Sequence, residues 1–257
     1  MKNTKRLFNI HLSTYFLVLS FLLTGLIKNI ILIYFIVIFH ELGHIFIIKI
    51  LGYKIVKVDI YPSGGLTTIN KKINTKILHD LLIASFGIIF QIILYLIFYL
   101  LFKMSWIREG TYLLFQTYNT TILIFNLLPI IPLDGYQFLR CVCELIFPYK
   151  KAFLMSAIIS IIFILFFITF NQIFPLNNYL IVTFLIYKMV TEFKNFKYQN
   201  YRFQLERALY NFKYHHIKNE KKPNLNLLKK DTYHFFKTNN TYISEKKLLE
   251  KKYLSLL

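Results

Sequence analysis

The most regular feature of the chain is a succession of long apolar runs separated by short polar stretches. Their lengths suit membrane-spanning helices, because about 20 apolar residues cover the hydrocarbon core of a bilayer. We therefore predict an all-α polytopic membrane protein with six transmembrane helices in a core that covers residues 1–190. The predicted spans are residues 12–27, 30–51, 77–102, 112–128, 152–170 and 179–190.

The polar stretch between the second and third spans does not have the pattern of a helix. From Asp59 to Ile69, apolar and polar residues alternate around Pro62-Ser63-Gly64-Gly65, which is typical of two strands joined by a turn. We predict a short membrane-associated β-hairpin there. Its edge can receive an extended peptide by strand addition, or the hairpin can simply connect the two spans, and the pattern favours neither.

Residues 191–257 are predicted to form a small cytosolic tail that is too short for a large second domain. Residues 232–236 and 241–243 have the composition of paired strands, and Ser244 is placed to cap a helix that runs through Leu256. We expect a β-β-α unit, which is either the remnant of a regulatory domain or a docking tail for a partner.

The basic residues orient the predicted spans. Taken in order, the termini and loops hold 3, 1, 5, 2, 3, 0 and 15 Lys and Arg residues. Cytosolic loops carry the excess of basic residues, so this alternation places both termini in the cytosol. The net charge of +19 then reflects membrane orientation and a tail that can contact anionic lipid, and we expect no nucleic-acid partner.

The second predicted span contains His40-Glu41-Leu42-Gly43-His44. Side chains four positions apart lie on one face of a helix, so both imidazoles can bind the same Zn²⁺, and Glu41 can reach a water bound to that metal. Ionisable groups at membrane depth are costly and therefore point to a function. The alternative, a pair of structural core histidines, does not explain why Glu41 accompanies them.

A catalytic zinc site needs a third protein ligand, which is often a carboxylate. Asp134 is the candidate, because it follows Pro129 and Pro132 in the stretch Asn126 to Gly135. The prolines deny a helix its hydrogen bonds, and irregular backbone at membrane depth is tolerated only where it is buried or lines a wet cavity. The second and fourth predicted spans both run toward the cytosolic leaflet. The alternative for Asp134 is an ordinary turn at the membrane surface.

These residues resemble the site-2 proteases, a family of intramembrane zinc metalloproteases. The resemblance rests on His40 to His44 in the second of six spans, and on Asn126-Leu127-Leu128-Pro129 and Pro132-Leu133-Asp134-Gly135. It implies a zinc metalloendopeptidase with one Zn²⁺ per chain. By resemblance, His40, His44 and Asp134 bind the metal and Glu41 is the catalytic base.

The spacing and compact size are most similar to the sporulation branch of that family, which processes the precursor of sigma factor K in the mother cell. Residues 201–210 also resemble the segment after the last span in that branch. The resemblance implies a multi-pass protein of the mother-cell membrane around the forespore of a spore-forming bacterium. It also implies a membrane-tethered substrate similar to pro-sigma-K and inhibitory or scaffolding membrane proteins as partners. An anti-sigma factor or another membrane precursor is the alternative substrate.

The sequence departs from the family pattern at three places. Tyr136 replaces a second glycine after Asp-Gly, and the third span reads Gly87-Ile88 with Gln91 where the family has Gly-Pro and an Asn. The tail is also too short for a whole cystathionine-β-synthase-type domain, which the branch usually carries. The residues predicted to bind substrate are Gly64, Gly65, Gln91, Asn126 and Pro132, and Gln91 is equally placed to contact the metal site.

Two other classes of function remain open. A catalytically silent membrane binding protein of the same fold has no physical need for His40, Glu41, His44 and Asp134 together. A transporter or channel predicts further charges at the membrane midplane or broken helices in paired halves, and neither is visible in the sequence.

Overall fold

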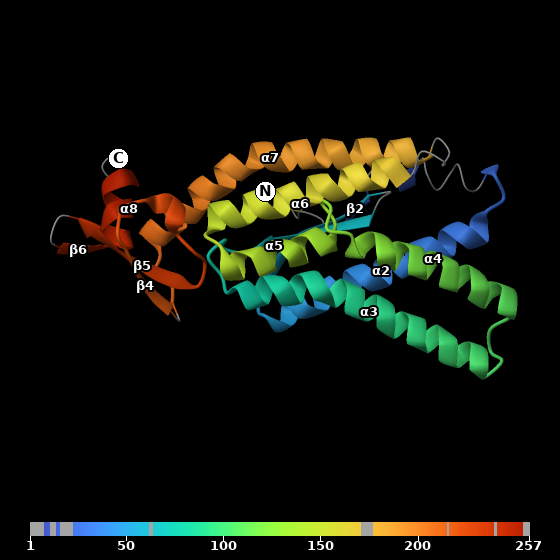
Figure 1. Cartoon of the computed structure of the whole chain (residues 1–257). Coiled ribbons are helices and arrows are strands. Elements are labelled where there is room, and N and C mark those ends of the chain that lie inside the picture. The colour runs from blue at the N-terminus through green and yellow to red at the C-terminus, as the bar shows by residue number, and fades with distance from the viewer. Residues whose placement is uncertain are drawn as a thin grey trace, which may run out of the picture. The chain divides into compact units, whose positions relative to one another are not determined.

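The chain forms two compact units, of which helices are the main elements (Figure 1). Unit 1 comprises Met1–Lys71 and Leu82–Leu127, and unit 2 comprises Lys72–Leu81 and Leu128–Leu257. The structure is a computed structural model. It describes residues 8–10, 14–15, 23–61, 64–170, 177–214, 216–238 and 241–253.

Three helices in the described part of the chain are long and apolar enough to cross a membrane. They are α2 (Ile27–Ile50), α3 (Ile77–Lys103) and most of α6 (Tyr149–Phe170). They coincide with the second, third and fifth predicted spans. A helix satisfies all of its backbone polar groups within one segment, as hydrocarbon requires, so these runs become helices despite their many β-branched isoleucines.

The six-span topology is only partly confirmed. The fourth and sixth predicted spans lie within α4 (Glu109–Leu127) and α7 (Asn177–Leu209), but neither helix meets the same measure of length and composition. The first predicted span, 12–27, lies mostly outside the described residues. The number of spans and the cytosolic placement of both termini therefore stay predictions.

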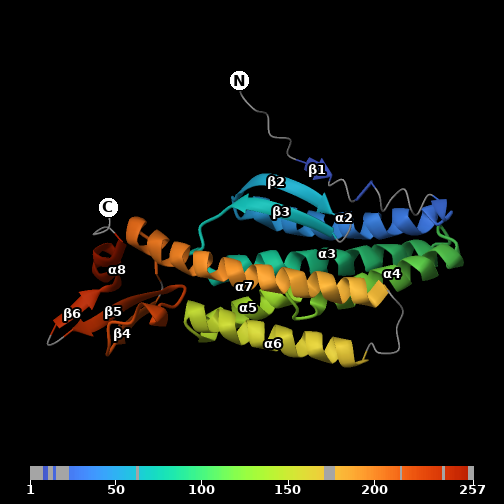
Figure 2. The same ribbon diagram turned by 90° about the horizontal axis from the view of Figure 1, so that it is seen from above.

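The predicted hairpin is confirmed in unit 1. Strands β2 (Lys54–Tyr61) and β3 (Gly64–Asn70) pair antiparallel, and both pack against α2 (Figure 2). A third strand, β1 (Phe8–Ile10), pairs in parallel with β2. The hairpin pattern could not predict β1, because a three-residue parallel partner from far away in the chain has no local turn to mark it.

Unit 2 contains α5 (Asp134–Ile146), α6 and α7. Phe153 of α6 stacks on Phe196 of α7 with ring centroids 3.7 Å apart, and Tyr149 stacks on Phe203 at 4.2 Å. Helix α7 thus extends beyond residue 190, the predicted end of the membrane core, and these contacts stabilise its extension. Hydropathy falls there, but one face of α7 stays apolar and buried.

The C-terminal part of unit 2 holds a second three-stranded sheet with a helix (Figure 1). The predicted β-β-α arrangement is confirmed by β5 (Thr232–Thr238), β6 (Thr241–Ser244) and α8 (Glu245–Tyr253). The Ser244 hydroxyl accepts a hydrogen bond from the Lys247 amide at 3.4 Å, as an N-cap does. Strand β4 (His216–Glu220), parallel to β5, was not predicted.

A fully buried ion pair fastens this sheet to the end of α7. Arg207 donates to both carboxylate oxygens of Glu245, at 2.7 and 2.8 Å, and to the carbonyl oxygens of Lys229 and Thr232. Both side chains are almost completely inaccessible. Such a pair is tolerated because each charge has several hydrogen-bond partners.

Candidate metal centre

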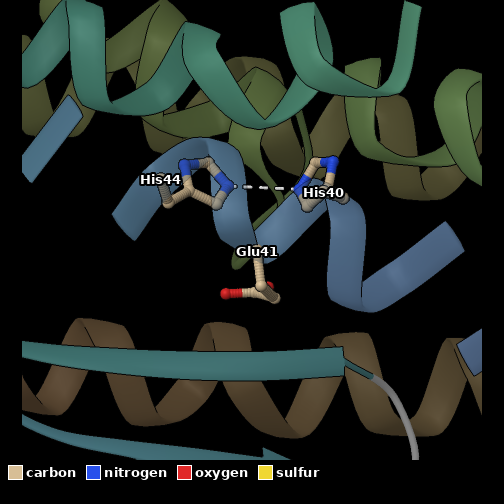
Figure 3. Close-up of side chains that lie close together, drawn as sticks. All are labelled: His40, Glu41 and His44. Atoms are coloured by element: carbon tan, nitrogen blue, oxygen red, sulfur yellow. Dashed lines mark hydrogen bonds between the residues drawn. The ribbon is translucent and has the colours of Figure 1, made fainter. Parts of the chain in front are cut away.

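The two histidines of α2 stand one helical turn apart and face each other (Figure 3). Their Nε2 atoms are 3.1 Å apart, and the residues are only 5% and 9% exposed. One ligand atom from each of His40, Glu41 and His44 lies within 4.8 Å of the other two. The structure thus brings together the three residues that the sequence singled out on this helix.

Neighbouring groups fix which nitrogen of each imidazole carries the proton. His44 Nδ1 lies 2.7 Å from the Ile83 carbonyl oxygen, which can only accept, so this Nδ1 must donate. Gln91 Nε2 donates to the Asn119 carbonyl at 2.9 Å, and this directs Gln91 Oε1 toward His40 Nδ1 at 3.2 Å. His40 Nδ1 must therefore also donate. In the neutral rings, both Nε2 atoms are left with lone pairs.

This arrangement fits a zinc ion. The two Nε2 atoms face each other at 3.1 Å, so one cation can bind to both. Zinc–nitrogen distances of 2.0–2.1 Å in a tetrahedron place two ligand nitrogens about 3.3 Å apart. Ligating histidines usually donate their other N–H to a carbonyl or carboxylate, as Ile83 and Gln91 allow here. The donor set of imidazoles and carboxylate is also one that zinc prefers.

Two glycines make room for this geometry where α2 and α3 meet. A Cβ on Gly87 of α3 would collide with His44 Nε2 and lie 2.7 Å from His40 Nε2. A Cβ on Gly43 of α2 would collide with the Phe86 carbonyl and lie 2.9 Å from the Phe90 Cβ. Small residues let helix backbones approach closely in membranes. The imidazoles occupy the space that a side chain on Gly87 would need.

Glu41 comes from the same turn of α2 but points toward a strand of the β2–β3 hairpin (Figure 3). The residue is half-buried. Its carboxylate can act as a base on a water that the two imidazoles hold through a metal.

Asp134 is the first residue of α5 and belongs to unit 2. The segment around it is fixed to α6 by two fully buried serines. Ile131 N donates to the Ser160 hydroxyl at 3.0 Å, and the hydroxyls of Ser156 and Tyr136 are 3.4 Å apart. These contacts give the proline-broken segment a defined backbone. Its role as the third zinc ligand stays a prediction from the sequence.

The residues predicted to bind substrate have different positions in the fold. Gly64 and Gly65 begin β3, Asn126 lies near the end of α4, and Pro132 precedes α5. Substrate contact at these four stays a prediction. Gln91 is fully buried and contacts His40, and its predicted substrate contact also stays a prediction.

Several contacts of the predicted site residues and their neighbours were not predicted from the sequence. Ser156 and Ser160 stand four apart in an apolar span, and this spacing was a readable signal of a shared polar face. The carbonyls of Ile83 and Asn119 left no signal, because any residue type supplies a backbone oxygen. Gly43 and Gly87 were noted only as parts of motifs.

We expect Gln91→Leu to weaken zinc binding by about 10–100-fold, the usual effect of losing a partner of a ligating histidine. The variant removes the acceptor for His40 Nδ1–H, so the ring can rotate or change tautomer. Competition with a zinc chelator measures the effect. Gln116→Leu is the matched control, because Gln116 is half-buried and its side chain donates to the Tyr95 hydroxyl at 3.4 Å. Equal affinities in the two variants would show that Gln91 does not orient His40.

Comparisons with known proteins agree with this geometry. Residues 28–111 match the sequence profile described as Peptidase family M50. Stage IV sporulation protein FB of Bacillus subtilis (strain 168) is 29% identical over 189 residues, which are 72% of this chain and 66% of that protein. Zinc metalloprotease MJ0392 of Methanocaldococcus jannaschii is 28% identical over 135 residues, 49% of this chain and 38% of that protein. The chain thus matches less than two thirds of the length of either relative.

A solved structure has the same fold. The Site-2 Protease from Methanocaldococcus jannaschii superimposes with a TM-score of 0.55 at 23% sequence identity. The match covers 72% of this chain and 89% of that one.

Proposed function

We propose that the chain is an active zinc endopeptidase of peptidase family M50, whose profile residues 28–111 match, and that it cleaves a membrane-associated protein near the cytosolic face. The observation that carries the proposal is that His40 Nε2 and His44 Nε2 lie 3.1 Å apart, on rings whose Nδ1 atoms each face an oxygen acceptor. A silent binding protein has no need for two ring nitrogens directed at one point, whereas a metal site requires this arrangement.

The proposed zinc ligands are His40, His44 and Asp134. When bound, zinc lowers the pKa of a water ligand and polarises the scissile carbonyl. Glu41 takes the proton of the attacking water and passes it to the leaving amine. Gln91 and Ile83 hold the two imidazoles in the tautomer that leaves Nε2 available.

The substrate must present an extended backbone for its carbonyl to reach the site. We propose that the β2–β3 hairpin holds it, with Gly64 and Gly65 at the start of β3 and with Asn126 and Pro132 also in contact. In the described residues β1 occupies one side of β2, so the sheet order β1-β2-β3 leaves the outer side of β3 for a peptide.

We propose a membrane-tethered precursor similar to pro-sigma-K as the substrate, in the mother-cell membrane of a sporulating bacterium. The similarity to a stage IV sporulation protein supports this choice. Inhibitory or scaffolding membrane proteins are the proposed partners. Co-expression with pro-sigma-K of the same organism, scored for a shortened product, tests the substrate. Cleavage of an anti-sigma factor instead would redirect the proposal within the same enzyme class.

Purified protein is expected to hold about one zinc ion per chain, and Asp134→Ala is expected to weaken zinc binding by roughly 100-fold or more, because two imidazoles alone leave the ion incompletely coordinated. Elemental analysis and chelator competition measure the two quantities. Glu109→Ala, which removes an exposed carboxylate at the start of α4, is the control. Absence of zinc from the wild-type protein would favour a silent binding protein.

A further inference from the structure

One loop of the tail contacts the ends of three helices, and all of these contacts lie within unit 2. The loop Leu228–Asp231 lies between the short 3-10 helix (Leu225–Leu227) and β5. The Leu228 carbonyl accepts from the amide of Tyr149, the first residue of α6, at 3.0 Å. Lys229 Nζ donates to the carbonyl of Ile146, the last residue of α5, at 3.3 Å. Both partners are helix-end groups that have no partner inside their own helix.

The same loop also fixes the start of α3. Asp231 Oδ2 accepts from the amide of Ile77, the first residue of α3, at 2.9 Å. The carboxylate thus caps α3 from more than a hundred residues away, and its charge suits the positive end of the helix dipole. Asp231 has a φ of 56°, a left-handed conformation that Asp tolerates better than most residues.

Lys230 is the central contact of the loop. Its ammonium lies 2.6 Å from Asp80 Oδ2 of α3 and 3.0 Å from Glu144 Oε2 of α5, and the residue is only 5% exposed. Burial lowers the pKa of Lys230, but the carboxylates of Glu144 and Asp80 raise it by more, so the side chain is charged. Arg140 donates to the other oxygen of Glu144 at 3.3 Å. A buried ammonium with two carboxylates specifies one position for each helix, because any displacement leaves a charge without its partner.

The helices that this loop holds carry the groups of the proposed metal centre. Helix α5 begins at Asp134 and ends at Ile146, where the loop contacts it. Asp134 lies ten residues before Glu144, which is about 15 Å along the helix at 1.5 Å per residue. Helix α3 starts at the loop, and six residues after Ile77 the Ile83 carbonyl receives the proton of His44 Nδ1. Helices of this length are stiff, so moving one end moves the other. Misplacing a reacting group by about 1 Å can cost about 100-fold in rate.

We propose that the loop Leu228–Asp231 is a positioning element for the metal centre, with Lys230 as its principal positioning residue. The inference rests on the proposed zinc protease and deepens it: the tail sets the geometry of the zinc-binding side chains through the ends of α3 and α5. No residue of the loop touches the metal or the substrate in this role. In this proposal the tail is required for full activity, because it positions the metal centre.

The test uses full-length protein in detergent with three lysine variants. Lys230→Met keeps the length of the side chain but removes the charge, and Lys230→Arg keeps the charge. Lys218→Met is the matched control, because the Lys218 side chain is 61% exposed and pairs with Glu220 of the same strand, β4. Zinc affinity is measured by chelator competition, and kcat and KM are measured for substrate cleavage, all at a temperature at which each variant is folded.

We expect Lys230→Met to weaken zinc binding by about 10–100-fold, as loss of second-layer support does, and to lower kcat while KM stays unchanged. Lys230→Arg should recover most of both quantities, and Lys218→Met should match the wild type. Should Lys230→Met fail to fold, Asp231→Ala decides the matter. It removes the cap of α3 and also places Ala in a left-handed conformation, and we expect roughly fivefold weaker zinc binding. Asp231→Asn keeps both the cap and the tolerated conformation, so it should recover the affinity.

Wild-type zinc affinity and kcat in folded Lys230→Met, or in Asp231→Ala where Lys230→Met does not fold, would overturn the positioning role. A lowered melting temperature with unchanged zinc affinity would overturn it as well, because the loop would then only stabilise the fold. A wild-type protein that binds no zinc would instead overturn the proposed function, so the two failures are distinguishable.

Discussion

Glu41→Gln is expected to abolish peptide-bond hydrolysis while zinc stays bound, with kcat falling by about 10²–10⁴-fold. Glutamine has nearly the same shape as glutamate but cannot take a proton from water. In this variant, His40 Nδ1 and His44 Nδ1 keep their hydrogen bonds to Gln91 and to the Ile83 carbonyl, so the proposed metal-binding atoms are unchanged. The measurements are cleavage of the co-expressed substrate and zinc content of the purified protein.

Glu109→Gln provides the control for this experiment. It makes the same chemical change at an exposed carboxylate at the start of α4. It should cleave at the wild-type rate. Full activity of Glu41→Gln would remove Glu41 from the mechanism. Loss of zinc in Glu41→Gln would instead identify Glu41 as a ligand, and Asp134 would then lose its proposed place.

Gly87→Ala is expected to weaken zinc binding by roughly 100-fold or more and to abolish cleavage. The added methyl group would lie 2.7 Å from His40 Nε2 and still closer to His44 Nε2, well inside van der Waals contact. Either the imidazoles rotate away from each other or α2 and α3 separate, and both changes destroy the pair of ligand atoms. Overpacking of this kind also destabilises a protein, typically by about 1–3 kcal/mol.

Two other glycine variants separate these effects. Gly43→Ala also forces α2 and α3 apart, because its Cβ collides with the Phe86 carbonyl, but none of the three atoms nearest to that Cβ belongs to an imidazole. We expect it to lower the melting temperature as much as Gly87→Ala while retaining more of the zinc affinity. Gly110→Ala meets nothing within 4 Å and should behave as the wild type. Equal zinc affinity in Gly87→Ala and Gly110→Ala would refute the role of Gly87.

The parts of the fold that were predictable depend on short-range patterns. Continuous apolar runs predicted α2, α3 and α6, since a segment in hydrocarbon must pair its own backbone groups. Alternation around Pro62 to Gly65 predicted the β2–β3 hairpin, and the same reasoning predicted β5, β6 and the cap at Ser244. The parallel strands β1 and β4 escaped prediction, because their pairing joins segments without a turn between them.

The sequence by itself determined which side chains can form the predicted centre. Spacing of four residues on a helix places His40 and His44 on one face, with Glu41 beside them, and this follows from helical geometry alone. The proline-broken stretch before Asp134 is equally legible, because few structures tolerate it at membrane depth.

Only the tertiary structure decided whether those imidazoles can bind a metal. The tautomers depend on the Ile83 carbonyl and on Gln91, and the orientation of Gln91 depends in turn on the Asn119 carbonyl of another helix. The space depends on the absence of a side chain at Gly87. The contacts of Lys230 join residues that are far apart in the chain. A local sequence pattern does not show which distant carboxylates will pair with this lysine. The sequence therefore identifies the predicted ligands, whereas their protonation and placement depend on how the helices pack around them.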